Sequence, residues 1–138
     1  MASTIGWDEG VWSHTPRDVA VDDAGLVVEA VEGSDAWRHT SYGFVHDSEH
    51  ALLVPFPEGS AMEVTFEAAF EAAFDQAGLM LRAGPELWIK TGVELSDGVL
   101  YAGAVVTVGQ SDWSVAALSR SARRARPTFR ASRSGPAV

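Results

Sequence analysis

The side chains best suited to chemistry lie on two alternating runs, residues 76–82 and 87–95. They flank the turn sequence Ala83-Gly84-Pro85-Glu86, which predicts an antiparallel β-hairpin. Because strand side chains alternate between two faces and both apolar faces must meet the core, the connecting loop must hold an odd number of residues. This register predicts four facing pairs, Arg82–Trp88, Met80–Lys90, Gly78–Gly92 and Gln76–Glu94.

The face of this hairpin opposite the core carries an amide, two cations, a carboxylate and an indole around two glycines. An indole stacks on the apolar face of a sugar ring, while the polar groups bond its hydroxyls. The alternative is a structural network without a ligand, in which Lys90 pairs with an acid and Arg82 stacks on Trp88. The predicted ligand-binding residues are Gln76, Arg82, Trp88, Lys90 and Glu94, joined from neighbouring strands by His39, Tyr42 and Trp113. Trp88 and Glu94 point away from the predicted core, so replacing them is expected to spare the fold.

Other chemistries find little support. The run His46-Asp-Ser-Glu-His50 offers metal-ligand types, but it lies in a turn and its spacing suits a helix face. Glu63, Glu67 and Glu71 share one strand face, yet neighbours would be about 13 Å apart, too far for the paired carboxylates of glycoside hydrolysis. No nucleophile elbow, phosphate loop or dinucleotide fingerprint is present. We therefore expect no catalytic residues, no metal site and no cofactor.

The rest of the chain predicts further short strands separated by turn residues. They are expected at residues 18–21, 26–31, 36–46, 51–56 and 99–108. The last follows the three-residue turn Ser96-Asp97-Gly98, a spacing that places Ala102 and Ala104 beside Lys90 and Gly92. Together these elements predict an all-β fold, an antiparallel β-sandwich.

Residues 61–75 have a pattern that fits two structures. Every even position from Met62 to Phe74 is apolar, while the odd positions carry four carboxylates, a threonine and alanines. This alternation favours one long strand, and the alanine content keeps a helix as the alternative.

Composition and charge narrow the class of protein. The chain has no cysteine, which excludes disulfides and thiolate metal sites and favours a reducing compartment. No targeting segment and no membrane span is evident, so a cytoplasmic location without membrane association is expected. All 19 acidic residues lie at or before Asp112, against four basic residues there, giving residues 1–115 a charge of −15. Such an acidic body argues against nucleic acid as a partner.

Five segments resemble one known family. They are Gly33 to Gly43, Asp75 to Met80, Trp88 to Glu94, Val105 to Thr107 and Ser111 to Ser114. Together they look like an uncharacterised bacterial and fungal family named for a fungal "regulation of enolase" protein, over roughly residues 7–115. The resemblance implies the concanavalin A-like lectin/glucanase jelly roll. The family has no settled activity, so the resemblance carries little function with it.

The C-terminal stretch departs from the family pattern. Residues 116–138 hold six arginines and no acid, and residues 116–129 show no clear apolar period. We therefore predict a concanavalin A-like domain over residues 1–115, incomplete at its C-terminus, and a basic, disturbed or disordered tail over residues 116–138. Missing strands would leave sheet edges open, which predicts self-association.

These observations predict a non-catalytic binding domain for a carbohydrate or similar polyol. A protein-interaction or regulatory module of metabolism is the alternative, which the family's name suggests. An enzyme acting on sugars is disfavoured, because retaining glucanases of this superfamily place several acids alternately on one strand. The segment Glu94-Leu-Ser-Asp97 does not supply that pattern.

Overall fold

The computed structural model describes residues 2–136 and confirms the predicted all-β class. Its contacts divide the chain into two units, Met1–Pro55 and Phe56–Val138. The first unit holds β1 (Val11–Trp12), β2 (Asp18–Asp22), β3 (Gly25–Glu29), β4 (Ala36–Arg38), β5 (Val45–Asp47), β6 (Leu52–Leu53) and a 3-10 helix, η1 (Trp7–Glu9). The second holds β7 (Ala61–Thr65), β8 (Gln76–Gly84), β9 (Leu87–Ser96), β10 (Val99–Val108), β11 (Gln110–Ala117), η2 (Arg120–Arg124) and β12 (Thr128–Ser132). Within residues 2–136, no helix has the length and apolar character needed to cross a membrane.

The first unit is built from three antiparallel strand pairs, β1–β6, β2–β3 and β4–β5. The predicted strand, turn and strand around residues 18–31 is confirmed as the β2–β3 hairpin. The single strand predicted over residues 36–46 is wrong, because the chain reverses between β4 and β5. His39 and Ser41 take positive φ angles of 63° and 67° there, and the His39 amide donates to the Phe44 carbonyl at 2.7 Å.

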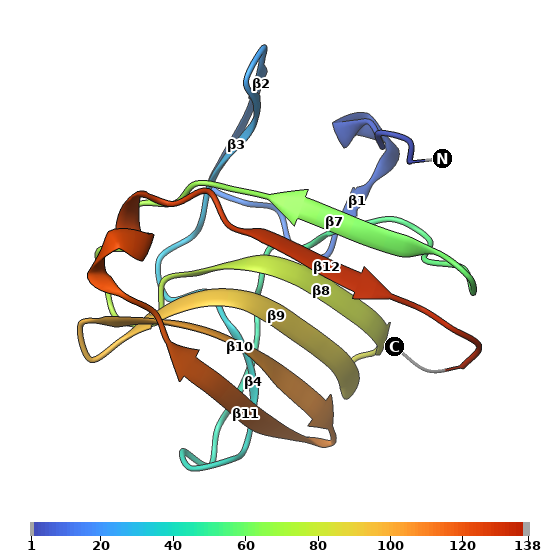
Figure 1. Ribbon diagram of the computed structural model, residues 1–138. Coiled ribbons are helices and arrows are strands. Elements are labelled where there is room, and N and C mark those ends of the chain that lie inside the picture. Colours follow the sequence, from blue (N-terminus) through green and yellow to red (C-terminus); the bar gives the residue numbers. More distant parts are fainter. Residues whose placement is uncertain (1, 137–138) are drawn as a thin grey trace. The chain divides into compact units, whose positions relative to one another are not determined.

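A four-stranded antiparallel sheet in the order β11-β10-β9-β8 forms the larger layer of the second unit (Figure 1). All four facing pairs predicted for the β8–β9 hairpin are present, and a bulge between Arg82 and Gly84 absorbs the turn. The period-2 pattern therefore determined this register correctly.

The turn between β9 and β10 differs from the prediction. It holds two residues, Asp97 and Gly98, and Ser96 pairs with Val99. Their φ angles of 50° and 75° are both positive, as a tight hairpin turn of this length requires, and an Asp-Gly pair adopts them readily. The one-residue difference turns Ala102 and Ala104 to the core side, so they do not lie beside Lys90 and Gly92 as expected.

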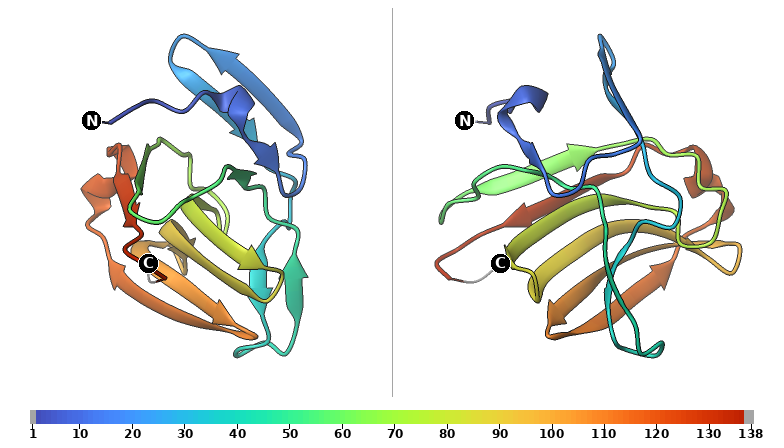
Figure 2. Two further views of the ribbon diagram at one scale, coloured as in Figure 1. Left: turned by 90° about the vertical axis from the view of Figure 1, so that its right-hand side faces the viewer. Right: turned by 180° about the vertical axis from the view of Figure 1, so that it is seen from behind.

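The smaller layer is the antiparallel pair β7–β12, which lies alongside the curved four-stranded sheet (Figures 1 and 2). The core between the layers is a cluster of Val93, Leu95 and Leu100 from the larger sheet. Partly buried side chains pack against that cluster, namely Phe66, Phe70, Leu118 and Phe129. The second unit is therefore an antiparallel β-sandwich.

Residues 61–75 form no helix, so the helical alternative is wrong. Paired strand covers only β7, yet alternate burial continues as far as Phe70. The chain then turns, because the Asp75 carboxylate accepts hydrogen bonds from the amides of Glu71 and Ala72, both at 2.9 Å. The observed strand, β7, is thus shorter than the strand predicted over residues 61–75, although the two faces were assigned correctly.

The arginine-rich stretch also differs from the expected disordered tail. The expected boundary at residue 115 falls inside β11, and residues 128–132 form β12 in register with β7. Three of the six arginines face carboxylates across this layer. The ion pairs are Arg130–Glu63 at 2.9 Å, Arg126–Glu67 at 2.8 Å and Arg133–Glu58 at 3.9 Å. Exposed pairs of this kind contribute about 0–1 kcal/mol each, so the apolar contacts of β12 carry more of its stability.

Phe129→Ala should destabilise the protein by about 2–4 kcal/mol, because it removes a partly buried ring from the core. Phe129 stacks on Phe66, with ring centroids 6.0 Å apart. Arg130→Gln, which removes only an exposed ion pair, is the control and should lose less than about 1 kcal/mol. Chemical denaturation measures both. Slow hydrogen exchange across residues 128–132 is also expected, and rapid exchange there would contradict a packed β12.

Candidate functional site

One face of the four-stranded sheet collects most of the predicted site residues. It is the face turned away from the Val93, Leu95 and Leu100 core, and we call it the glycine face. Its side chains form four rows across β8, β9, β10 and β11. They are Gln76–Glu94–Tyr101–Ala117, Gly78–Gly92–Gly103–Val115, Met80–Lys90–Val105–Trp113 and Arg82–Trp88–Thr107–Ser111.

Three glycines in the second row allow neighbouring backbones to approach very closely. A Cβ atom on Gly78 would lie 2.0 Å from the carbonyl oxygen of Thr91, and one on Gly92 would lie 2.0 Å from that of Ala77. A Cβ on Gly103 would lie 2.2 Å from the oxygen of Ser114. Glycine is therefore required here by the backbone.

The row at the β8–β9 turn end is largely buried. Trp88 is 5% exposed, and Thr107 and Ser111 are buried with their hydroxyl oxygens 2.9 Å apart. Trp88 consequently presents no open ring face for a ligand to stack on. Its replacement would also damage the fold, contrary to the expectation from sequence.

The accessible side chains of the face lie in the first and third rows, although Val105 in the third row is 2% exposed. Gln76, Lys90, Glu94, Tyr101 and Trp113 are all partly exposed. The rings of Tyr101 and Trp113 meet edge to face, with centroids 6.3 Å apart. Because these residues lie in the first and third rows, their contact crosses the glycine row. Tyr101 was missed by the sequence analysis, and the Asp97-Gly98 pair was the signal that could have placed it on this face.

The polar residues of the glycine face are not isolated. Gln76, Arg82, Lys90 and Glu94 are each engaged in at least one noncovalent interaction, and the Gln76 amide donates to the Phe74 carbonyl at 3.1 Å. Such interactions restrict the positions of these side chains before any ligand binds.

His39 and Tyr42 belong to the first unit, at the β4–β5 turn. Tyr42 is 56% exposed and stacks on Phe44 with centroids 5.1 Å apart. It also meets Trp37 edge to face at 6.1 Å. Tyr42 therefore belongs to an aromatic cluster within the first unit, while six of the eight predicted residues lie on the glycine face of the second unit.

A group of possible metal ligands occurs in the first unit. One ligand atom from each of His14, Asp47 and Glu49 lies within 4.8 Å of the others. The His14 Nδ1 atom is 2.7 Å from the Glu49 carbonyl oxygen, which can only accept, so this nitrogen donates. His50 is fully used, donating from Nδ1 to the His14 carbonyl and accepting at Nε2 from the Val31 amide. His50, at the end of the polar run 46–50, thus links the backbone at His14 to the backbone at Val31.

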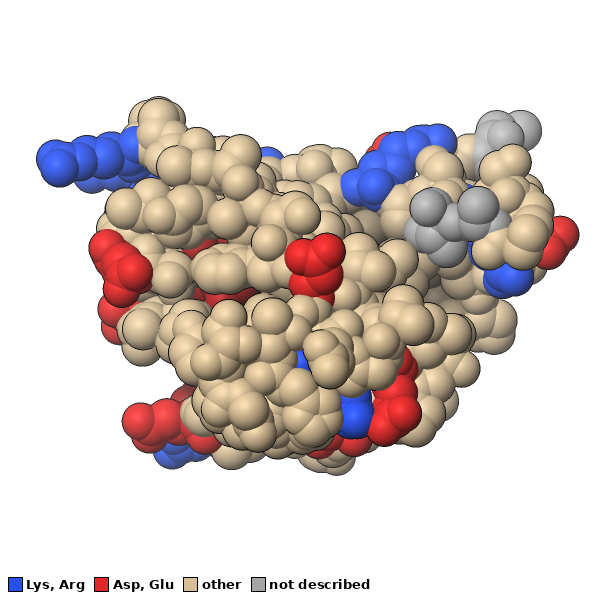
Figure 3. Space-filling model, turned by 90° about the horizontal axis from the view of Figure 1, so that it is seen from below, with Lys and Arg blue, Asp and Glu red and all other residues tan. Residues whose placement is uncertain are grey.

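Charged side chains stand in small separate groups on the face shown in Figure 3. Much of the surface in that view is uncharged. Binding of a neutral ligand by such a surface would depend on local contacts and not on a strong electrostatic field.

The fold is thus that of an antiparallel β-sandwich, and comparison with known proteins gives its family. Residues 12–138 match the sequence model of the family described as "Protein of unknown function (DUF1349)". The chain belongs to this family.

Two relatives come from Saccharomyces cerevisiae. The chain is 37% identical over 115 residues to "Regulation of enolase protein 1", which confirms the resemblance described from sequence. A crystal structure of a functionally unknown protein matches with a TM-score of 0.74 and 39% identity. Each match covers 83% of this chain, but only 58% of the first relative and 62% of the second.

Gly92→Ala should destabilise the protein by about 1–3 kcal/mol, because the added methyl group meets backbone atoms that cannot move independently. Gly84→Ala is the matched control on the same hairpin, where an added Cβ meets nothing within 4 Å. The control should change the free energy of unfolding by less than about 1 kcal/mol. Equal effects in chemical denaturation would show that the glycine row is not a region of enforced backbone contact.

Proposed function

We propose that this domain is a non-catalytic binding module whose glycine face takes a carbohydrate or similar polyol. The observation that carries the proposal is the Tyr101–Trp113 ring pair, which crosses the glycine row beside the partly exposed Glu94 and Gln76. Trp113 replaces the buried Trp88 as the aromatic anchor.

The chemistry of these groups suits a polyol. Indole and phenol rings pack against the C–H faces of a sugar, whereas carboxylate, amide and ammonium groups bond its hydroxyls. Gly78 and Gly92 carry no side chain, so β8 and β9 present bare backbone in this row, where a flat ligand could lie. The interactions in which these polar groups already take part lower the cost of ordering them on binding.

Hydrolysis of a sugar is disfavoured by the charges on this face. Glu94 is the single carboxylate among its sixteen residues, as the strand register places them. Glycoside hydrolysis commonly needs two carboxyl groups about 5–9.5 Å apart. The lectin/glucanase jelly roll implied by the family resemblance fits a binding role of this kind.

A thermal-shift screen against mono- and disaccharides, followed by calorimetry, tests the proposal. Trp113→Ala and Glu94→Gln should each weaken binding of the best ligand, the aromatic change by about 1–3 kcal/mol. Asp112→Asn is the control, because Asp112 lies beside Trp113 on β11 and its side chain points to the opposite face. Absence of any sugar ligand, or equal affinity in all three variants, would defeat the proposal.

The second candidate is a protein-interaction module that regulates metabolism. It is favoured by the relative named "Regulation of enolase protein 1". β11 is an edge strand of the four-stranded sheet, and a partner protein could pair with it. Asp112 is its single charged residue, and Val115 is 40% exposed. Self-association through that edge would use the same backbone N–H and C=O groups of β11 that a partner protein would pair with. Enolase assays with and without the domain test regulation of a partner protein. Sedimentation of the domain alone tests self-association.

A further inference from the structure

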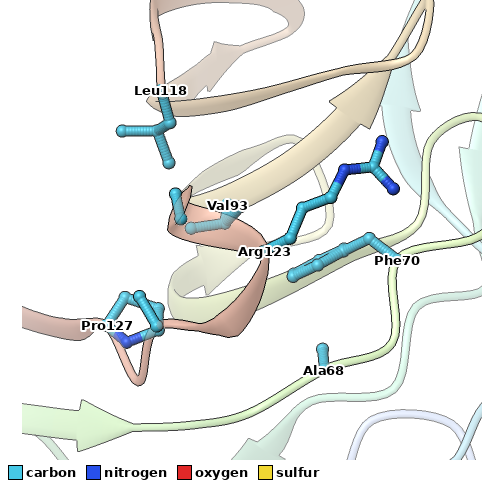
Figure 4. A pocket seen from close by; sticks show the side chains of 8 residues that line it. Ala68, Phe70, Val93, Leu118, Arg123 and Pro127 are labelled. Carbon is cyan, nitrogen blue, oxygen red and sulfur yellow. The ribbon is translucent and has the colours of Figure 1, made fainter. Parts of the chain in front are cut away.

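An apolar cavity of about 170 Å³ lies in the second unit, on the core side of the four-stranded sheet (Figure 4). It is lined by Ala68, Phe70, Val93, Leu118, Ala122, Arg123, Ala125 and Pro127. Val93 is 3% exposed, so the cavity reaches the hydrophobic core. It is separate from the glycine face, because Val93 points to the opposite side of β9 from Gly92.

The cavity follows from the residues that connect β11 to β12. Hydrogen bonds fix both ends of this connection, from the Leu118 amide to the Leu100 carbonyl and from the Phe66 amide to the Pro127 carbonyl. Between them, η2 buries none of its residues. Within residues 119–126, the cavity is lined by Ala122, Arg123 and Ala125. The two alanine side chains are too small to fill the space beside Val93.

The size and lining suit a small apolar group. An engineered cavity of about 150 Å³ lined by Leu, Ile and Phe in another protein stays dry and binds benzene. The present cavity is of similar volume and is lined by the ring of Phe70 and the aliphatic side chains of Val93 and Leu118. A six-membered ring or a short branched chain is therefore the appropriate occupant.

One lining residue adds a charge. Arg123 is the single charged residue among the eight, and its Nη2 atom donates to the Gly98 carbonyl at 3.1 Å. That bond uses one of the five N–H donors of a guanidinium. Arginine pairs well with carboxylates because its donors match both oxygens.

The surrounding segment strengthens this preference. η2, which contributes to the lining, carries Arg120, Arg123 and Arg124 and no acid, and this local positive charge favours an anion. We propose that the cavity binds a small apolar carboxylate, with its ring or branched chain beside Phe70, Val93 and Leu118 and its carboxylate on Arg123.

Benzoate is the probe, titrated into the full chain and followed by amide NMR and calorimetry. We expect saturable binding with shifts centred on Val93, Leu118 and Ala122. Benzyl alcohol, which lacks the charge, and acetate, which lacks the ring, should each bind at least tenfold more weakly. Arg123→Gln should reduce benzoate affinity at least tenfold.

Arg124→Gln is the matched control. It removes the same charge from the next residue along the chain, whose side chain does not line the cavity. It should change benzoate affinity less than twofold. Ala122→Leu should abolish benzoate binding by filling the cavity. If Ala122→Leu does not fold, Ala125→Val is the replacement variant for the same test. Equal loss in the two arginine variants, equal binding of benzyl alcohol, or no binding of benzoate would overturn the proposal. Sugar binding at the glycine face should be unaffected by these variants, so the two sites fail independently.

Discussion

The close backbone approach at Gly78, Gly92 and Gly103 is the constraint on which the second unit depends. Side chains in this row would collide with carbonyl oxygens of the adjacent strands, so only glycine permits this approach. The row also divides the face. The partly exposed Glu94 and Tyr101 lie on one side of it, and the partly exposed Lys90 and Trp113 lie on the other. A backbone requirement thus separates the two groups of accessible side chains.

The opposite side of the same sheet depends on charge as well as on apolar packing. Glu63 on β7 pairs with Arg130, and Glu67 just beyond the strand pairs with Arg126, while Phe129 enters the core. Each exposed ion pair contributes little to stability, but opposite charges favour β12 beside β7 over repulsion within the arginine-rich stretch. The asymmetry between an acidic body and a basic C-terminal stretch is therefore a feature of strand pairing.

Two binding proposals follow from one sheet because its faces are chemically different. The glycine face combines aromatic rings with polar groups and suits a hydroxylated ligand. The core-side cavity is apolar apart from Arg123 and suits a small anion with a hydrophobic body. Either ligand would assign a chemistry to a family described as one of unknown function.

The sequence by itself determined the all-β class, the family and the register of the β8–β9 hairpin, because a period-2 pattern specifies which residues share a face. It did not determine the next hairpin, where counting Ser96 into the turn moved Tyr101 to the wrong side and hid an aromatic residue of the candidate site. Only the tertiary structure showed that Trp88 is buried and that residues 128–132 pair with β7. Those outcomes depend on contacts between residues far apart in the chain, such as Arg130 and Glu63, and local patterns carry no information about such partners.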